Sequence, residues 1–301
     1  MISGMKLLLT SLFISFITAS AMAESTPEKV LLGQFEKSAL AAAEEVDGVF
    51  GIVVKDLKTG YTFSHNPDLV LTQASSIKVQ ILAEVLLQAE RGEFSLDDVV
   101  TVERSDFVGG SGIFNGLTPG KLSMPIRDIA MFMIVLSDNT ATNMLIDLVG
   151  MESVNRMLDE FGFPETRLQR IMMDREARLA GRENISTPAE AARFLEMIYN
   201  GEILNEESRS EFLRILSFPK RGRISRDLPG GVTVAHKGGS VGGVFNDIGI
   251  VLLKDRPFVV SAMTSWNADR QLAEDAIAKI SLLAYNCFER LEHSNAFGHR
   301  K

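Results

Sequence analysis

The sequence predicts an α/β protein: an antiparallel sheet flanked by helices, together with an all-helical part. Strand patterns rich in β-branched residues occur near both ends of the chain, whereas the stretch between them, about 73–215, has helical periodicity. Short turns join consecutive strands, which favours antiparallel pairing because parallel strands need long crossover connections. We therefore expect a discontinuous α/β domain formed by residues 24–72 and 216–301, and a helical domain formed by residues 73–215.

The first 23 residues have the features of a secretory signal peptide. Lys6 supplies a positive charge, residues 7–18 are predominantly apolar, and Ala21-Met22-Ala23 matches a cleavage site. The apolar stretch is short for a membrane-spanning helix, and no Cys stands at the cleavage site. These features predict a periplasmic or secreted protein without a stable membrane anchor.

The composition argues against several classes of partner and cofactor. The chain has 31 basic and 39 acidic residues and a formal net charge of −8, which argues against nucleic acid as a partner. Its one cysteine, Cys287, cannot form an internal disulfide and lies in an apolar helical pattern, as a buried hydrophobic residue does. The four histidines are scattered without an H-x-x-x-H pair. We expect no metal site and no cofactor, and a monomer.

Both ends of the chain combine strands with one long helix. The first end begins with a helix near 28–45, followed by a hairpin whose strands are 49–56 and 61–64, with Gly60 in the turn. The last end contains three strands and a long helix for which Asn267 is the expected cap. The expected ranges are Val232–His236, Asp247–Leu253, Phe258–Met263 and Ala268 to about Leu291.

Capping residues mark two helix boundaries in the middle of the chain. The segment Thr187-Pro188-Ala189-Glu190 has the capping-box pattern with Pro at the first helical position, and Gly201 ends that helix. Gly150 similarly ends the helix that contains residues 144–148.

Ser75 and Lys78 form the first motif with chemical meaning. They open an apolar helix that ends at Gly92, and residues three apart share a helix face, so both side chains point the same way from the first turn. A serine hydroxyl needs a nearby base to attack an acyl carbon, and a lysine in apolar surroundings has the depressed pKa that suits this task. A second S-x-x-K match, Ser217 to Lys220, is not followed by an apolar helix. The alternative for Ser75 is a helix N-cap.

The second motif is Ser137-Asp138-Asn139, which follows the apolar helix 129–136. A hydroxyl and an amide at a helix junction can relay a proton and hold a substrate amide. A capping cluster is the alternative interpretation.

The third motif is His236-Lys237-Gly238-Gly239-Ser240, at the expected end of a strand. The lysine would place positive charge opposite a substrate carboxylate, and the small residues after it, Gly239 in particular, would let the substrate backbone lie against the strand edge. An ordinary turn between two strands is the alternative.

Together the three motifs resemble those of class A β-lactamases, in the superfamily of serine β-lactamases and penicillin-binding proteins, which carry S-x-x-K, S-D-N and K-T-G in this order. The resemblance covers nearly the whole chain after residue 23 and implies a β-lactamase/transpeptidase-like fold. It implies a serine hydrolase acting on cyclic amides, with a β-lactam or a peptidoglycan-like small molecule as substrate and an acyl-enzyme at Ser75. The alternative is a D,D-peptidase or esterase that acylates in the same way but deacylates β-lactams slowly.

The resemblance also implies catalytic roles for individual residues. Ser75 would be the acylated nucleophile and Lys78 its general base or proton relay. Ser137 would pass the proton to the leaving nitrogen.

It implies binding roles in the same way. Asn139 would hold the substrate side-chain amide, and Lys237 would orient the substrate carboxylate and Ser137. The backbone N–H groups of Ser75 and Ser240 would form the oxyanion hole.

The chain departs from the family pattern at Gly238, where the family has Thr or Ser. A hydroxyl that binds the substrate carboxylate is therefore missing. Ser240, two positions later, could replace it.

A larger departure follows Arg170. The family carries R-x-E-P-x-L-N there, and its Glu activates the water that hydrolyses the acyl-enzyme. Counting from Arg170 places Met172 at that position, and Asp174 and Glu176 are the nearby carboxylates, of which Glu176 has the longer reach. Asn143 matches a family asparagine that orients the Glu, which suggests that a carboxylate partner remains.

Two competing functions are less consistent with the sequence. The segment 238–242 matches G-x-S-x-G, but a strand rather than a helix follows it, so a Ser-His-Asp hydrolase is not expected. A non-catalytic peptidoglycan-binding protein would not need Ser75, Lys78, Ser137 and Lys237.

Overall fold

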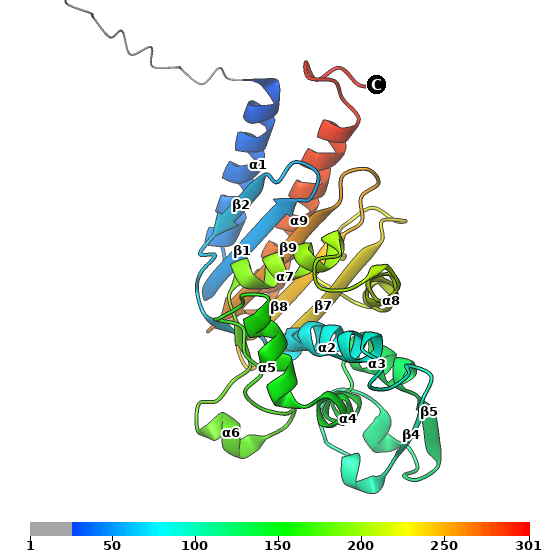
Figure 1. Ribbon diagram of the computed structural model, residues 1–301. Coiled ribbons are helices and arrows are strands. Elements are labelled where there is room, and N and C mark those ends of the chain that lie inside the picture. The colour runs from blue at the N-terminus through cyan, green and yellow to red at the C-terminus, as the bar shows by residue number, and fades with distance from the viewer. Residues whose placement is uncertain (1–25) are drawn as a thin grey trace, which may run out of the picture.

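A five-stranded antiparallel sheet forms the centre of the molecule, in the order β2-β1-β9-β8-β7 (Figure 1). The computed structural model describes residues 26–301, so the predicted signal peptide lies outside the described residues. The strands are β1 (Val49–Asp56), β2 (Thr62–His65), β7 (Val234–Val241), β8 (Val244–Val251) and β9 (Phe258–Ser265). The predicted antiparallel sheet, with strands from both ends of the chain, is confirmed.

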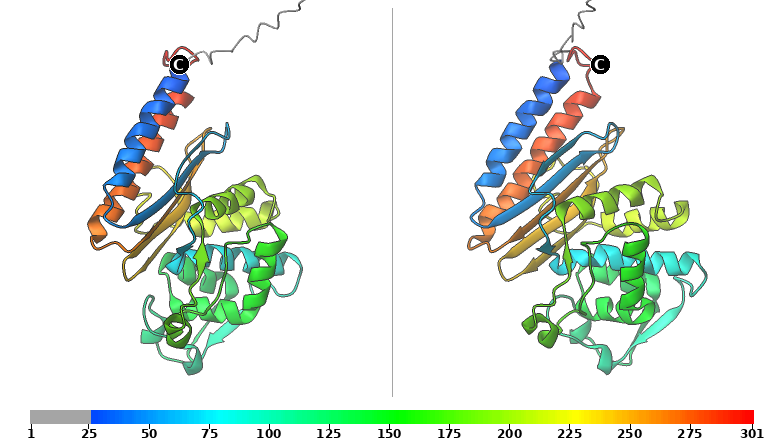
Figure 2. Two further views of the ribbon diagram at one scale, coloured as in Figure 1. Left: turned by 90° about the vertical axis from the view of Figure 1, so that its left-hand side faces the viewer. Right: turned by 60° about the vertical axis from the view of Figure 1, so that its left-hand side comes forward.

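Two long helices, α1 (Pro27–Glu44) and α9 (Arg270–Glu292), lie side by side along one face of this sheet (Figure 2). The core between them and the sheet is rich in aromatic residues. The ring of Phe288 packs against that of Phe258, with centroids 5.1 Å apart. Cys287 is buried in this layer, as expected for a hydrophobic residue.

The predicted cap of α9 is wrong. The helix begins after Asp269, whose carboxylate accepts hydrogen bonds from the backbone N–H groups of Gln271 and Leu272. Asn267 instead donates its side-chain amide to the carbonyl of Gly243, 2.7 Å away. It thereby ties the end of β9 to the β7–β8 hairpin.

The other face of the sheet carries α7 (Pro188–Asn200), α8 (Glu206–Ser217) and the remaining helices (Figures 1 and 2). The predicted start and end of α7 are confirmed: Thr187 Oγ1 accepts from the N–H of Glu190 at 3.0 Å, and Gly201 has a left-handed φ of 76°. Gly150 likewise ends α4. The remaining helices are α2 (Lys78–Glu90), α3 (Ile126–Val135), α4 (Asn139–Val149), α5 (Met151–Glu160) and α6 (Arg175–Leu179).

Helix α2 runs through the middle of the helical part and is buried from Lys78 to Gln88. Most of its residues are apolar, and its polar residues Gln80, Glu84 and Gln88 are buried with them. This burial fixes the position of the segment just before it, which contains Ser75.

Two-stranded ladders connect the remaining loops. Strand β3 (Leu71–Thr72) pairs with β6 (Ile185–Ser186), and β4 (Val99–Val102) pairs with β5 (Leu122–Pro125). The proposed division into two domains stays a prediction, and its boundary at 215/216 falls inside α8.

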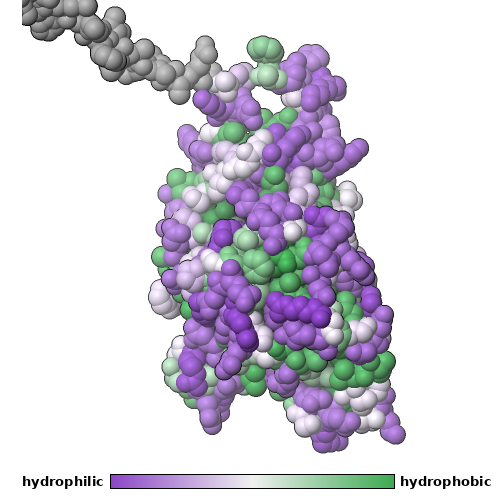
Figure 3. All heavy atoms as spheres, in the orientation of Figure 1, coloured by the Kyte–Doolittle hydropathy of each residue, from purple (hydrophilic) through white to green (hydrophobic). Residues whose placement is uncertain are grey.

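Hydrophilic residues predominate on the face shown in Figure 3, with hydrophobic residues in patches between them. Within residues 26–301, no helix is both long enough and apolar enough to cross a membrane.

Candidate active site

Ser75 lies in a single 3-10 turn, η1 (Ala74–Ile77), that leads directly into α2. The predicted α-helical start is therefore wrong by one turn. The hydroxyl of the neighbouring Ser76 donates to the carbonyl of Gln73 at 2.8 Å. Ser75 is half-buried, and among residues 26–301 its hydroxyl has no hydrogen-bond partner. Gln73 stands at the N-cap position and the turn has no side-chain cap, so the Ser75 hydroxyl is not used as a cap.

Lys78 is fully buried, and its ammonium group is held by three acceptors. Nζ donates to the carbonyl of Ser137 at 2.8 Å, to Ser137 Oγ at 3.1 Å and to Asn139 Oδ1 at 3.1 Å. Burial lowers the pKa of Lys78 well below its ordinary value, and the nearby charge of Lys237 lowers it further, whereas Asp138 raises it. These influences favour the neutral amine, which is the form that can accept a proton.

Ser137 links two lysines. Its Oγ accepts from Lys78 Nζ and from Lys237 Nζ, each at 3.1 Å. Its φ of 53° lies in the left-handed region, which non-glycine residues rarely adopt. Strain of this kind persists where the surroundings fix the backbone, and it places the hydroxyl between the two amines.

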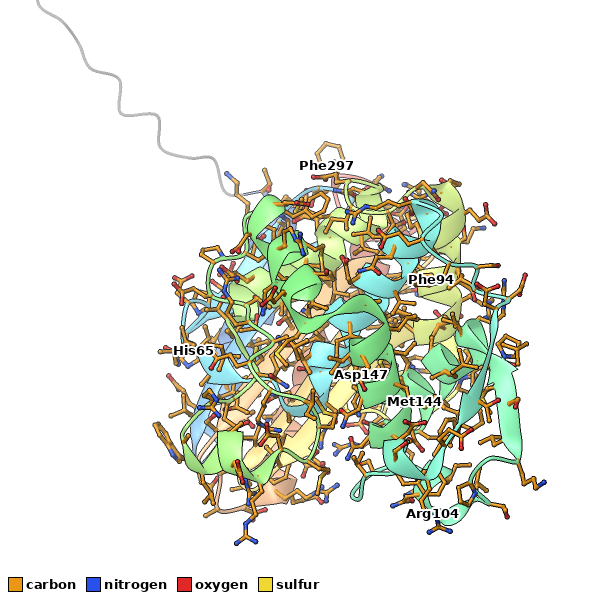
Figure 4. All side chains as sticks on the ribbon, turned by 60° about the horizontal axis from the view of Figure 1, so that its bottom comes forward. His65, Phe94, Arg104, Met144, Asp147 and Phe297 are labelled. Atoms are coloured by element: carbon orange, nitrogen blue, oxygen red, sulfur yellow. The ribbon has the colours of Figure 1, made fainter. Side chains whose placement is uncertain are left out.

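Both carboxylate oxygens of Asp138 accept hydrogen bonds that fix the backbone next to Ser137. One carboxylate oxygen caps α4 by accepting from the N–H of Ala141 at 3.0 Å. The other accepts from the N–H groups of Ile113 and Phe114 at 2.6 and 2.9 Å. A Cβ added at Gly112 would lie 2.1 Å from this carboxylate, so the loop can approach only with glycine there. Figure 4 views this end of the molecule, with Met144 marking α4.

Asn139 spans the site. Its Oδ1 accepts from Lys78, as above, while its Nδ2 donates to the carbonyl of Gly109 at 3.0 Å. Each end of the amide keeps one further hydrogen-bonding site, so the predicted contact with a substrate amide does not require either partner to be released.

Lys237 lies inside strand β7, which continues to Val241, so the predicted end of this strand at His236 is wrong. The motif pairs with β8 residue by residue, with Gly238 opposite Asp247 and Ser240 opposite Phe245. Ladder pairing outweighs the low strand preference of glycine here.

Gly239 brings β7 against the nucleophile turn. A Cβ at this position would lie 2.5 Å from the carbonyl oxygen of Gln73 and 2.9 Å from the backbone nitrogen of Ser75. Only glycine permits this approach, which places the backbone of Ser240 next to that of Ser75. We refer to Ser75, Lys78, Ser137 and Lys237 as the Ser75 cluster.

Lys237 is buried and donates to Ser137 Oγ and to the carbonyl of Gly238. Burial lowers its pKa to about 7; Asp247 raises it, and the positive charges of Lys220 and Arg223 lower it. The amine is thus poised between charged and neutral forms near neutral pH.

Arg223 is a site residue that the sequence did not reveal. It donates to Ser240 Oγ at 2.7 Å and to the carbonyl of Asn246 at 2.8 Å. A Cβ at Gly238 would lie 3.2 Å from its guanidinium, so glycine at this position leaves room for the arginine. The residue lies in an irregular loop without a motif, and its contacts are distant in sequence.

Asn246 is a second such residue. Its Nδ2 donates to the carbonyls of Thr72 and Gln73 at 2.7 and 3.1 Å, and its Oδ1 accepts from the N–H of Thr264. It therefore joins β8 and β9 to the chain just before Ser75 and helps to position the nucleophile.

The 170–183 loop is closed at its base. Arg170 forms an ion pair with Glu183 at 2.6 Å, and the amide of Asn184 bonds the backbone of Gln169 and Arg170. The loop is thus a compact structure whose ends are held together.

Met172 occupies the position that counting predicts for the deacylating Glu, and it is buried. Asn143 holds its backbone at both ends: Oδ1 accepts from the N–H at 2.8 Å, and Nδ2 donates to the carbonyl at 3.1 Å. The expectation that Asn143 retains a carboxylate partner is therefore wrong, because its amide is taken by the backbone.

The two acidic candidates lie further along the loop. Asp174 caps α6 by accepting from the N–H of Ala177 at 2.8 Å, and Glu176 is exposed on that helix. Figures 1 and 2 show α6 apart from the start of α2. Among residues 26–301, no hydrogen bond joins either carboxylate to the Ser75 cluster. Their role in deacylation stays a prediction.

Among residues 26–301, no group of three or more His, Cys, Asp or Glu side chains is arranged to hold a metal ion.

Comparisons with known proteins agree with this geometry. Residues 34–288 match the model of the β-lactamase enzyme family. An imipenem-hydrolysing β-lactamase of Enterobacter cloacae is 28% identical over 249 residues, covering 80% of this chain and 85% of that protein. The crystal structure of a β-lactamase from Sphaerobacter thermophilus is 32% identical, with a TM-score of 0.79, covering 85% of this chain and 97% of that one.

A third similar structure is a mutant of PBP-A, described as an acyl-enzyme complex with penicillin G. It is 26% identical with a TM-score of 0.76, and the match covers 86% of this chain and 96% of that one. The family model spans most of the chain, and the folds agree over nearly the full length of the solved relatives. The chain belongs to the class A β-lactamase family.

Proposed function

We propose that this protein is a serine hydrolase that opens β-lactam rings through a covalent acyl-enzyme at Ser75, and that hydrolysis of this acyl-enzyme is its slow step. The observation that carries the proposal is a contrast between two places: the amines of Lys78 and Lys237 converge on Ser137 Oγ, whereas Asn143, which faces the loop, holds the backbone of Met172.

The cluster supports acylation in a definite order. The neutral amine of Lys78 takes the proton of the Ser75 hydroxyl as its oxygen attacks the carbonyl carbon of the lactam. Backbone N–H groups of Ser75 and Ser240 stabilise the negative charge that develops on the carbonyl oxygen. Ser137, which accepts hydrogen bonds from both lysines, passes a proton to the ring nitrogen as the C–N bond breaks.

The binding side of the site supports an acidic substrate. Lys237 provides the positive charge for a substrate carboxylate, and the Ser240 hydroxyl, oriented by Arg223, takes the place of the hydroxyl missing at Gly238. A β-lactam carries such a carboxylate next to its ring nitrogen.

Deacylation needs a water molecule and a base beside the acyl carbon. Asp174 is engaged as a helix cap, and Glu176 is exposed on α6, so the 170–183 loop offers no carboxylate in contact with the cluster. This favours the slow-deacylating alternative over rapid β-lactam turnover, and it is consistent with the similarity to a PBP-A mutant described as an acyl-enzyme complex.

The proposal is tested with a fluorescent penicillin. Wild-type protein should become labelled at one site, and Ser75→Ala should remain unlabelled. Ser76→Ala is the matched control because Ser76 neighbours Ser75 but its hydroxyl bonds only Gln73. Labelling of Ser75→Ala at the wild-type rate would place the nucleophile elsewhere.

A further inference from the structure

A second concentration of positive charge lies outside the Ser75 cluster. A pocket of about 580 Å³ is formed by the 220–226 loop and the start of α9. The whole chain carries a net charge of −8, whereas the residues lining this pocket are mostly basic. Its charged lining residues are Lys220, Arg221, Arg223, Arg226, Arg270 and Glu274.

Carboxylates neutralise this charge only in part. A single oxygen, Glu274 Oε1, accepts from both Arg223 and Arg270, at 2.7 and 3.0 Å. Arg226 is better matched, because it pairs with Asp227 and with Asp275. Two guanidinium groups therefore share one carboxylate oxygen at one side of the pocket.

Lys220 and Arg221 have no carboxylate within ion-pair distance in the described part of the chain. The ammonium of Lys220 donates to the backbone carbonyls of Leu216 and Phe218. Burial lowers the pKa of Lys220 to about 8, while Asp247 raises it. Arg221 is exposed. An anion entering the pocket would thus meet Arg221, which has no carboxylate partner among residues 26–301, and Lys220, whose charge Asp247 offsets only in part.

The pocket adjoins the active site through Arg223. This guanidinium contacts Glu274, which lines the pocket, and the hydroxyl of Ser240, which follows Lys237 on β7. Ser240 is exposed and lies three residues after Lys237 on β7. A ligand whose first acidic group lies at Lys237 and Ser240 could therefore extend a second one past Arg223.

We propose that this basic pocket binds a second anionic group, a carboxylate or a phosphate, of substrates whose first acidic group is held by Lys237 and Ser240. Arginine forks favour planar or tetrahedral oxyanions, and a surplus of cations in a pocket attracts them at longer range. The inference rests on the proposed function, because it names a class of acyl donor: molecules with two negative charges at the end that carries the ring carboxylate.

Direct binding is measured by calorimetric titration with citrate and, separately, with pyrophosphate at constant ionic strength. Wild-type protein should bind at one site, and Arg221→Gln and Lys220→Gln should each weaken binding roughly fivefold, the upper range for one exposed charge pair. Lys254→Gln, which removes an exposed charge outside the pocket lining, is the control and should stay within about twofold. Tighter citrate binding indicates a carboxylate ligand, and tighter pyrophosphate binding a phosphate ligand.

Absence of binding to the wild type, or equal weakening in the Lys254→Gln control, would overturn the proposal. Arg221 is exposed, so its substitution is not expected to disturb folding, and the melting temperature of each variant checks this.

The link to catalysis uses two cephalosporins that differ only in a 3-substituent ending in a carboxylate or a carboxamide. The carboxylate form should acylate the wild type roughly fivefold faster, and Arg221→Gln should remove this preference. Equal acylation rates in the wild type would refute the inference and leave the proposed function intact. If neither compound acylates the protein, the proposed function is wrong, and the citrate and pyrophosphate titrations alone show whether the pocket binds anions.

Discussion

The Ser75 cluster and the 170–183 loop lie on the same protein but use their hydrogen bonds differently. In the cluster, side chains bond to one another as well as to backbone carbonyls: both lysines converge on Ser137 Oγ. In the loop, side chains bond mainly to backbone, as Asn143 does with Met172 and Asp174 with the start of α6. The first arrangement can move protons, whereas the second fixes a shape. Under the proposed function, acylation and deacylation therefore depend on separate parts of this molecule.

The largest effect should come from the cluster. Lys78→Met removes the amine that accepts the serine proton, and we expect the acylation rate constant to fall by roughly a hundredfold to ten-thousandfold. Stopped-flow measurement with a chromogenic cephalosporin gives this constant. Methionine preserves the buried volume, and the circular dichroism spectrum shows whether the variant is folded. A rate within a factor of a few of the wild type would show that Lys78 is not the base.

A substitution at residue 172 can supply the carboxylate that the 170–183 loop does not place near the Ser75 cluster. Met172→Glu places a carboxylate at the position where the family pattern has one, and we expect deacylation to accelerate by about a hundredfold, the typical worth of a positioned base. Met172→Gln is the matched control, since it has the same shape but no basic group. Equal deacylation rates for the two variants would mean that the loop holds residue 172 away from the acyl carbon.

The pH dependence of acylation reports on Lys237. Only its protonated form attracts a substrate carboxylate, and its pKa is lowered to about 7. We therefore expect kcat/KM for acylation to decline as the pH rises above about 7, approaching tenfold per pH unit. Because the charge of Lys220 lowers this pKa, Lys220→Gln should shift the decline to higher pH. The exposed Lys254→Gln is the control, and an identical shift there would assign the decline to another group.

The smallest effect is expected at Glu176. Its carboxylate is exposed on α6, so Glu176→Gln should change the deacylation rate by less than about threefold, in line with the small worth of exposed charges. Asp174→Asn should behave in the same way, because asparagine also caps helices well. A hundredfold slowing by either change would assign the deacylation base to that residue and contradict the separation of the two regions.

Motif order was sufficient to predict the family, because Ser75, Lys78 and Ser137 each stand beside a helix boundary with a clear local signal. The antiparallel sheet was predicted from strand patterns joined by short turns. Local sequence patterns gave a wrong prediction where hydrogen bonding to a strand elsewhere in the chain determines the structure. Gly238 and its neighbours resemble a turn, yet pairing with β8 extends β7 through them.

Other features depend on contacts that no local pattern encodes. Arg223 reaches Ser240 and Glu274, which lie 17 and 51 residues away along the chain. The choice of Asp269 rather than Asn267 as the α9 cap follows from the competing bond of Asn267 to Gly243. The side-chain amide of Asn143 bonds the backbone N–H and carbonyl of Met172. No local pattern distinguishes this partner from a carboxylate, so the partner could be identified only in the folded chain.

We propose that this protein has the groups needed for acylation of Ser75 but no carboxylate in position to hydrolyse the acyl-enzyme. The most direct test is mass spectrometry of wild-type protein mixed with excess penicillin G and then freed of it. We predict one adduct of intact penicillin mass, located on the peptide that contains Ser75, which persists after the free compound has been removed. Rapid consumption of penicillin with no accumulated adduct, or an adduct on a peptide without Ser75, would contradict the account.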